Sequence, residues 1–313
     1  MKRILVTGAA GQIGSELTAL LAEKHGADHV LATDIALPDP KNTAGIPFER
    51  LDVTDGDAVA ALFQKHRPEG VYHMAAILSA SGEKTPDKAW KVNIDGLYNV
   101  LEAARRLDGV RMFCPSSIAV FGPATPREST PQDTVLDPRT IYGVTKVAGE
   151  MLCDYYVRRY GLDVRGCRFP GIISHKTLPG GGTTDYAVAI FYEAVKTGRY
   201  ECFLKEDTRL PMMYMPDCLK SIVDLMEADF GRLRHHANFN VTAMSFSAGE
   251  LAAEIKKHRP DFVCTYEPDF RQDIADSWPA SIDDTAAREE WDWSPDYDLA
   301  RMTEDMLGAL NKR

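Results

Sequence analysis

A tyrosine and a lysine stand four positions apart in the segment Tyr142-Gly-Val-Thr-Lys146, and the serine pair Ser116-Ser117 precedes them in the chain. On a helix, side chains with this spacing lie on one face, about one turn apart. A phenol cannot act as a base near neutral pH, because its ordinary pKa of about 10 keeps it protonated, and a nearby ammonium group stabilises the phenolate. These residues could therefore remove a proton from a substrate hydroxyl, with Tyr142 as the general base and a serine orienting the same oxygen.

Three glycines close to the start of the chain indicate a site for an anion. Gly8, Gly11 and Gly14 follow the apolar run Ile4-Leu-Val6 and open a segment in which apolar residues recur at helical spacing. This pattern predicts a buried strand, a tight turn and a helix, so that free backbone N–H groups at the helix N-terminus can bind a phosphate. The glycine spacing alone is weak evidence, because most glycines in turns serve only the turn.

An isolated acid, Asp34, follows Gly14 by twenty residues, at the end of the second predicted strand, His29–Thr33. A carboxylate at this place accepts hydrogen bonds from both hydroxyls of an adenosine ribose and repels a 2′-phosphate. The turn and the acid together therefore predict an NAD site rather than an NADP site. With NAD⁺ bound, Tyr142 would take the proton of a substrate hydroxyl while hydride leaves for the coenzyme, and Lys146 would lie near the nicotinamide ribose.

The elements that position these residues alternate between strand and helix. Further strands are expected at residues 48–51, 70–73, 111–114 and 163–168, with Ser116-Ser117 ending the fifth strand, and helices after Asp55, from about 87 to 107 and from 140 to 160. This alternation predicts an α/β fold, a Rossmann-type doubly wound parallel sheet with helices on both faces. Ligands of such sheets bind at the carboxyl ends of the strands, where we expect Gly8–Gly14, Asp34, Asp52, Ala75, Ser116-Ser117 and Phe169-Pro170 to converge.

The sequence changes in character after residue 170. Residues 178–184 form a glycine-dense segment, and residues 256–293 are rich in Pro, Asp and Trp. We expect residues 1–170 to form an NAD-binding Rossmann domain. Residues 171–313 are expected to form mainly a smaller C-terminal substrate-binding domain, with some segments returning to the Rossmann domain.

Composition excludes several classes of partner. The chain of 313 residues carries a net charge of −10 and no block rich in Lys or Arg, so we expect no binding to nucleic acid or to an anionic membrane. No apolar run reaches the length of a membrane span, and the first strand begins too early for a signal peptide. We therefore expect a cytoplasmic protein with a small-molecule substrate.

The cysteines and histidines do not have the spacing of metal ligands. The six cysteines form no CxxC pair, so reduced buried thiols are expected rather than zinc or a disulfide framework. The one histidine pair, His235-His236, is interpreted as a surface loop because adjacent side chains point in different directions. No metal site is predicted.

Five motifs together resemble the extended short-chain dehydrogenase/reductase family, which includes UDP-galactose 4-epimerase; they are Thr7-Gly-Ala-Ala-Gly-Gln-Ile-Gly14, His73-Met-Ala-Ala76, Val92-Asn93, Ser116-Ser117 and Tyr142-Gly-Val-Thr-Lys146. The resemblance covers nearly the whole chain. It implies that Ser117 is the catalytic serine, Tyr142 the acid/base and Lys146 the cation that binds the ribose. The implied NAD contacts are Gly8, Gly11, Gln12, Ile13, Gly14, Asp34, Asp52, Val53, Met74, Ala75, Ala76, Asn93, Tyr142, Lys146 and Ile172. For Asn93, a local capping or bridging role remains an alternative.

The same resemblance implies a homodimer. In this superfamily two long helices from each subunit, here those expected at 87–107 and 140–160, pair across the interface as a four-helix bundle.

The second half of the chain departs from the pattern of nucleotide-sugar enzymes. Those relatives usually carry an arginine that binds the UDP pyrophosphate, at the start of an eight-residue segment that ends in aspartate. The corresponding segment here is Leu210-Pro-Met-Met-Tyr-Met-Pro-Asp217, and alignment on the final aspartate puts Leu210 at the position of the arginine. Arg209 is one residue away, so a shift of register could restore the contact. The departure nonetheless predicts a smaller substrate.

Three further segments resemble the short-chain group of L-threonine 3-dehydrogenases: Ile77-Leu-Ser-Ala80, Leu178-Pro-Gly-Gly-Gly-Thr-Thr-Asp-Tyr186 and Ile274-Ala-Asp-Ser-Trp-Pro-Ala-Ser-Ile-Asp-Asp284. Arg139-Thr-Ile-Tyr-Gly-Val-Thr-Lys146 also fits that group. The resemblance implies oxidation of the L-threonine 3-hydroxyl to 2-amino-3-oxobutanoate with NAD⁺.

A small amino acid needs partners for its carboxylate, ammonium and hydroxyl. The candidate substrate contacts are Ser79, Ser116, Tyr142, Thr184 and Trp278. Ser79, Thr184 and the N–H groups of residues 180–182 could hold the carboxylate, and Trp278 could exclude water. Each of these residues could equally serve a turn, a linker or packing. Arg127 is a further candidate for the carboxylate, although a surface position is the simpler interpretation.

Two other functions remain open at this point. The first is an epimerase or dehydratase that retains NAD and acts on a nucleotide sugar. The second is a regulator that senses NAD without catalysis, which an intact Ser117, Tyr142 and Lys146 disfavours.

Overall fold

The computed structural model describes residues 1–37, 45–176, 180 and 182–312. Its largest sheet has six strands in the order β3-β2-β1-β4-β5-β7, and each neighbouring pair is parallel. These strands are β1 (Ile4–Thr7), β2 (Val30–Asp34), β3 (Phe48–Arg50), β4 (Gly70–His73), β5 (Arg111–Phe113) and β7 (Asp163–Arg165). Strand order reverses between β1 and β4, which is where ligands of such sheets bind. The predicted α/β Rossmann-type fold is confirmed.

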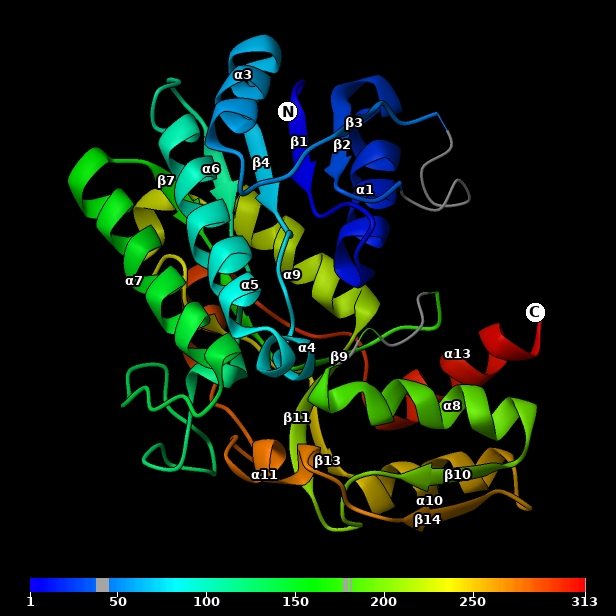
Figure 1. The fold of residues 1–313 in the computed structure, drawn as a ribbon. Coiled ribbons are helices and arrows are strands. Elements are labelled where there is room, and N and C mark those ends of the chain that lie inside the picture. Colours follow the sequence, from blue (N-terminus) through cyan, green and yellow to red (C-terminus); the bar gives the residue numbers. More distant parts are fainter. Residues whose placement is uncertain (38–44, 177–179, 181, 313) are drawn as a thin grey trace.

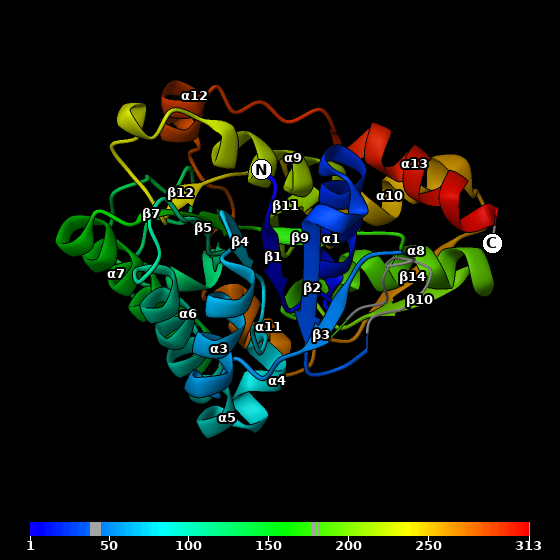
Figure 2. The ribbon, with the colours of Figure 1, turned by 90° about the horizontal axis from the view of Figure 1, so that it is seen from above.

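Helices cover both faces of this sheet. α1 (Gln12–His25) and α9 (Met215–Glu227) lie on one face, and α3 (Gly56–His66), α6 (Gly96–Ala104) and α7 (Ile141–Tyr160) lie on the other (Figure 2). α3 begins as predicted, because the Asp55 carboxylate accepts a 3.0 Å hydrogen bond from the Ala58 N–H. Its apolar stripe of Val59, Leu62 and Phe63 is buried against the sheet.

The long helix expected from about 87 to 107 contains an irregular turn. α5 (Pro86–Trp90) passes through a π-helical turn (Lys91–Asp95) into α6, which ends at Ala104. A π-helical turn adds a residue to the helix and rotates the side chains that follow it. Asn93 lies within this turn and is buried.

The single strand predicted at 163–168 is wrong, because the chain changes sheet at Gly166. β7 ends at Arg165, and β8 (Cys167–Phe169) pairs instead with β6 (Ser116–Ser117) and β12 (Phe239–Asn240). The serine pair is therefore a separate short strand and not the end of β5. A Cβ at residue 166 would collide with the Cys114 carbonyl oxygen, so only glycine allows the two backbones to cross this closely.

The rest of the chain forms a lobe at the carboxyl ends of the sheet strands (Figure 1). Its sheets contain β9 (Gly171–Ile173), β11 (Arg209–Tyr214) and β13 (Met244–Ser247), and the pair β10 (Arg199–Cys202) and β14 (Val263–Tyr266). Its helices include α8 (Tyr186–Lys196), α10 (Ala248–His258), α11 (Arg271–Asp276) and α13 (Leu299–Asn311). α9 belongs to the later sequence yet packs on α1 and β5. The domain boundary at residue 170 stays a prediction.

Two shorter helices lie in different places. α4 (Ser79–Lys84) follows β4, packs on α7 and begins with Ser79, which borders the site. α12 (Thr285–Trp291) packs on β12, and none of its residues lines the crevice described below.

We expect Gly166→Ala to lower the free energy of unfolding by about 1–3 kcal/mol, because the added methyl group forces Cys114 and residue 166 apart. Gly308→Ala is the matched control, because a Cβ at this position in α13 meets nothing within 4 Å. That control should keep or raise stability by up to about 1 kcal/mol. Denaturant unfolding of both variants measures the difference, and equal stabilities would contradict the crossing at Gly166.

Candidate active site

Two adjoining cavities lie at the carboxyl edge of the six-stranded sheet. The first, of about 920 Å³, is lined by the end of β2, by the loops that follow β1, β2, β3 and β4, and by Lys88, Lys91 and Val92. The second, of about 1020 Å³, reaches α7, β6 and the start of α8. Gly11, Met74 and Ala76 line both cavities, so the two form one continuous crevice.

The glycine turn makes room for a phosphate at the start of α1. Gly8 has φ +69°, and a Cβ there would collide with the backbone of Ala75. A Cβ at Gly14 would collide with the Gly8 carbonyl oxygen. α1 begins after Gly11, which supplies no side-chain cap, so the first N–H groups of the helix face the crevice. This bare backbone fits a dinucleotide pyrophosphate.

Two aspartates stand at the end of the first cavity that is remote from α7. Asp34 accepts hydrogen bonds of 3.0 Å from the N–H groups of Ala10 and Ala36. The Asp52 carboxylate accepts bonds from the N–H and the hydroxyl of Thr54, which hold the pKa of Asp52 below its usual range. Together with Val53 these acids line one end of the cavity, where their carboxylates can accept hydrogen bonds from ribose hydroxyls.

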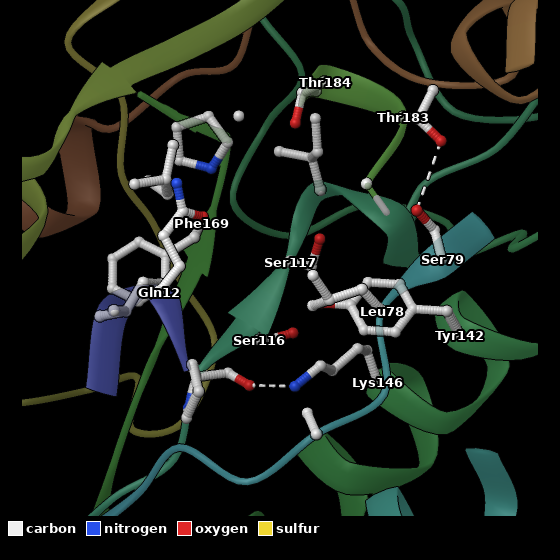
Figure 3. A pocket seen from close by; sticks show the side chains of 18 of the residues that line it. Gln12, Leu78, Ser79, Ser116, Ser117, Tyr142, Lys146, Phe169, Thr183 and Thr184 are labelled. Atoms are coloured by element: carbon white, nitrogen blue, oxygen red, sulfur yellow. Dashed lines mark hydrogen bonds between the residues drawn. The ribbon is translucent and has the colours of Figure 1, made fainter. Parts of the chain in front are cut away.

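The residues proposed for proton transfer meet in the second cavity. The Thr140 hydroxyl accepts a 3.0 Å bond from the Gly143 N–H and so starts α7 directly before Tyr142. The Lys146 Nζ donates a 2.7 Å bond to the Pro115 carbonyl and lies 5.5 Å from the centre of the Tyr142 ring. Ser117 enters from β6, and Figure 3 shows its side chain beside Tyr142, with Gln12 and Phe169 across the cavity.

Most of the predicted substrate contacts line the same cavity. Ser79, Thr184 and Trp278 all border it, although Trp278 is only 5% exposed. The Ser79 hydroxyl lies 3.3 Å from that of Thr183 (Figure 3). Ile172 also borders this cavity. Of the glycine-dense segment 178–184, Leu178, Pro179 and Gly181 lie outside the described residues, as does Thr177 before it.

Ser116 also borders this cavity, and its contact with a substrate stays a prediction. Its hydroxyl donates a 2.5 Å bond to the buried carboxylate of Glu150. Adjacent residues of a strand point to opposite sides, so Ser117 faces the cavity when Ser116 faces α7.

Sequence reasoning missed Asp185, which is the one carboxylate that borders the second cavity within the described part of the chain. It precedes α8 and accepts a 2.8 Å bond from the Gly182 N–H. Thr183 was also missed. The available signal was the run Thr-Thr-Asp before an apolar helix, a pattern typical of a helix start.

Asn93 borders neither cavity of the crevice but supports its wall. Its side chain accepts a 2.8 Å bond from the Ile77 N–H and donates to the Ile77 carbonyl and the Thr145 hydroxyl, each at 3.0 Å. These partners lie 16 and 52 positions away, so the local capping alternative is wrong. The π-helical turn directs Asn93 toward the loop after β4.

Neither candidate arginine faces the crevice. Arg127 donates a 2.6 Å bond to the Asp276 carbonyl. Arg209 donates to the Ser245 carbonyl and to Glu250 on another surface, and Leu210 is fully buried. A shift of register therefore does not restore the arginine of nucleotide-sugar enzymes.

The histidines and cysteines serve the structure. His73 contacts the Thr7 hydroxyl at 2.9 Å, and burial, followed by the charge of Lys146, lowers the pKa of His73 to about 3. His235 contacts Glu290 and Asp133. Within the described ranges no group of His, Cys, Asp or Glu could hold a metal ion, and the six cysteines are free thiols. In the same ranges no helix has the length and apolar character needed to cross a membrane.

The fold and the site together define a dinucleotide-dependent protein of the short-chain dehydrogenase type, with serine, tyrosine and lysine at the end of the coenzyme crevice. More specifically, the chain belongs to the NAD dependent epimerase/dehydratase family, whose model matches residues 4–241.

Similar proteins span the whole chain. A structure titled L-threonine dehydrogenase from Clostridium difficile is 51% identical, with 100% of this chain and 98% of that chain covered and a TM-score of 0.97. A GalE-like L-threonine dehydrogenase from Cupriavidus necator, in its holo form, is 49% identical, with 98% and 99% covered and a TM-score of 0.96. An uncharacterized epimerase/dehydratase of Staphylococcus haemolyticus is 50% identical, with 100% and 99% covered.

We expect Asp34→Ser to raise the Kd for NADH about tenfold and to reduce the preference for NADH over NADPH. The charged acceptor is lost, and so is the repulsion of a 2′-phosphate. Asp28→Ser, at an exposed position near the start of β2, is the control and should bind NADH as the unchanged protein does. Fluorescence titration measures both coenzymes, and an unaltered preference in Asp34→Ser would contradict this assignment.

Proposed function

We propose that this protein is an NAD-dependent L-threonine 3-dehydrogenase, which oxidises the 3-hydroxyl of L-threonine to 2-amino-3-oxobutanoate. One observation carries the proposal: Ser117, Tyr142 and Lys146 share a cavity that continues into a dinucleotide crevice. The chain's similarity over its full length to L-threonine dehydrogenases supports the choice of substrate.

The coenzyme contacts are proposed from the lining of the two cavities. We assign the adenosine end to Asp34, Asp52 and Val53, and the pyrophosphate to the turn from Gly8 to Gly14. The remaining contacts proposed are Gln12, Ile13, Met74, Ala75, Ala76, Tyr142, Lys146 and Ile172. Asn93 is proposed to hold the loop after β4 in place without touching the coenzyme.

Three side chains have separate roles in the proton transfer. Tyr142 removes the proton of the 3-hydroxyl, Lys146 holds its positive charge 5.5 Å from the centre of the Tyr142 ring, and Ser117 donates a hydrogen bond to the same oxygen. When bound, NAD⁺ supplies the ring carbon that takes hydride from C3 of the substrate. The C3–H electron pair and the O–H proton thus leave separately, and the C3–O bond becomes a carbonyl.

The two charged groups of the substrate have partners in the turn before α8 and at the start of α4. We assign the threonine ammonium to the Asp185 carboxylate and the carboxylate to the hydroxyls of Ser79 and Thr184. N–H groups before α8 add positive potential on the carboxylate side. Trp278 and Leu78 supply apolar surface that keeps water from the reacting atoms.

The charge of the cavity disfavours the nucleotide-sugar alternative. Lys146 is the one Lys or Arg that borders the second cavity in the described part of the chain. A sugar nucleotide brings a second pyrophosphate, which needs a bidentate or paired cation. Arg209, which is adjacent to Leu210 in the sequence, binds Glu250 on another surface instead.

Purified protein should form NADH, measured by absorbance, when L-threonine and NAD⁺ are added. We expect Tyr142→Phe to lose about a hundredfold or more of kcat, because the base is gone. Tyr155→Phe is the control on the same helix, where the side chain is half exposed.

Two results would contradict the proposal. Turnover of a UDP-sugar without any of threonine would favour the epimerase or dehydratase. Unchanged turnover in Tyr142→Phe would remove the tyrosine from the chemistry and revive the non-catalytic alternative.

We further propose that the protein acts as a cytoplasmic homodimer. Six thiols without a disulfide suit a reducing compartment. Large apolar side chains remain exposed on the two helices expected to pair: Trp90, Tyr98, Val144, Met151 and Tyr155. Such a row on neighbouring helices favours burial against a second copy.

Sedimentation at micromolar concentration should therefore give twice the chain mass of 34.7 kDa. Met151→Glu places a charge where the side chain is 65% exposed and should shift the equilibrium toward monomer. A single species at the mass of one chain in the unchanged protein would contradict the dimer.

A further inference from the structure

We propose that the buried ion pair of Glu150 and Arg168, with the hydroxyl of Ser116, is a positioning device that fixes Ser117 relative to Tyr142 and Lys146. In this role none of the three residues needs to touch substrate or coenzyme. The inference rests on the proposed dehydrogenase function and assigns that same site further positioning residues.

The ion pair is buried and bidentate. Arg168 donates from Nε to Glu150 Oε1 at 2.9 Å and from Nη2 to Oε2 at 2.8 Å. The side chains are 3% and 6% exposed. Two parallel hydrogen bonds between planar groups fix orientation as well as distance, which a single contact would not.

One partner belongs to the helix that carries the base. Glu150 follows Lys146 by four residues and Tyr142 by eight, so all three lie along one face of α7. Any rotation of α7 about its axis would move the phenol and the carboxylate together. The bidentate contact therefore resists that rotation.

The other partners belong to the strands that carry the serine. In the parallel register Ser116 pairs with Arg168 and Ser117 with Phe169. The Ser116 Oγ donates to the same Glu150 oxygen that accepts from Arg168 Nε. β6 and β8 are thus fastened to α7 at the residue directly before Ser117.

Arg168 also forms hydrogen bonds with residues outside α7 and β6. Its Nη1 donates to the Gln132 carbonyl at 2.9 Å and to the Asn240 side chain at 3.3 Å. Asn240 donates in turn to the carbonyls of Thr130 and Asp283. Asp283 follows Trp278 by five residues, so the Arg168 guanidinium connects α7 through Asn240 to the segment that contains Trp278.

Stability alone does not account for such a pair. Removing two charges from water costs free energy that their attraction often fails to exceed, and apolar residues of similar volume can replace them without loss. The benefit here lies in geometry, because a displacement of about 1 Å at reacting groups can cost a hundredfold in rate.

Ser116→Ala is the sharpest test, because it removes one hydroxyl and leaves the charges paired. Glu150→Gln and Arg168→Lys alter the pair itself, the second keeping the charge but losing the planar fork. Ser221→Ala, in α9, is the matched serine control, because that buried hydroxyl donates only to the Cys218 carbonyl. Glu290→Gln is the matched control for a buried, paired carboxylate remote from the site.

The readouts are kcat and KM for threonine, the Kd for NADH, the melting temperature, and the isotope effect with C3-deuterated threonine. We expect Ser116→Ala to lower kcat about tenfold and Glu150→Gln and Arg168→Lys about 10- to 100-fold, with NADH affinity within about twofold. The isotope effect should rise as hydride transfer becomes slower. The controls should keep kcat within about twofold, even where Glu290→Gln lowers the melting temperature.

Unchanged kcat in Ser116→Ala would overturn the inference. So would a loss of kcat that matches the controls at equal loss of melting temperature, since this marks a purely structural role. If the unchanged protein oxidises threonine and the variants do so with the same kcat, the inference fails and the proposed function stands. If the unchanged protein does not oxidise threonine, the proposed function fails and the inference falls with it.

Discussion

The turn after β1 approaches the loop after β4 so closely that no side chain fits between them. At Gly8 a Cβ would collide with the backbone of Ala75, and at Gly14 one would collide with the Gly8 carbonyl. This contact brings the start of α1 to the point where strand order reverses. The coenzyme crevice, and with it the distance from Asp34 to Tyr142, depends on that bare backbone.

The residues proposed for catalysis and substrate binding lie on elements that are far apart in the sequence and close together in the fold. α7 carries Tyr142 and Lys146 in its first two turns, while Ser117 lies on β6, which pairs with β8 after the crossing at Gly166 and contacts that helix. The start of α8 adds Asp185 to the other side. Among the described residues that line the second cavity, Lys146 and Asp185 are the charged ones, and this pair supports the proposed zwitterionic substrate over a sugar nucleotide.

Sequence patterns predicted the structural features that depend only on residues close together in the chain. The glycine turn, the Asp55 cap and the helix from Thr140 follow from spacing and capping, because each needs only its neighbours in the chain. The sheet change at Gly166 escaped because only Cys114, fifty-two residues earlier, forbids a side chain there. The bond from Ser116 to Glu150 escaped for a similar reason, since tertiary packing brings these two residues together. No periodicity encodes such contacts.

The central claim is that hydride leaves C3 of L-threonine for NAD⁺ as Tyr142 takes the hydroxyl proton. A single turnover with C3-deuterated L-threonine and mass analysis of the coenzyme tests this transfer directly. The account predicts free NADH that carries one deuterium from the substrate. Coenzyme without deuterium, or deuterium returned to the substrate within the turnover, would contradict it.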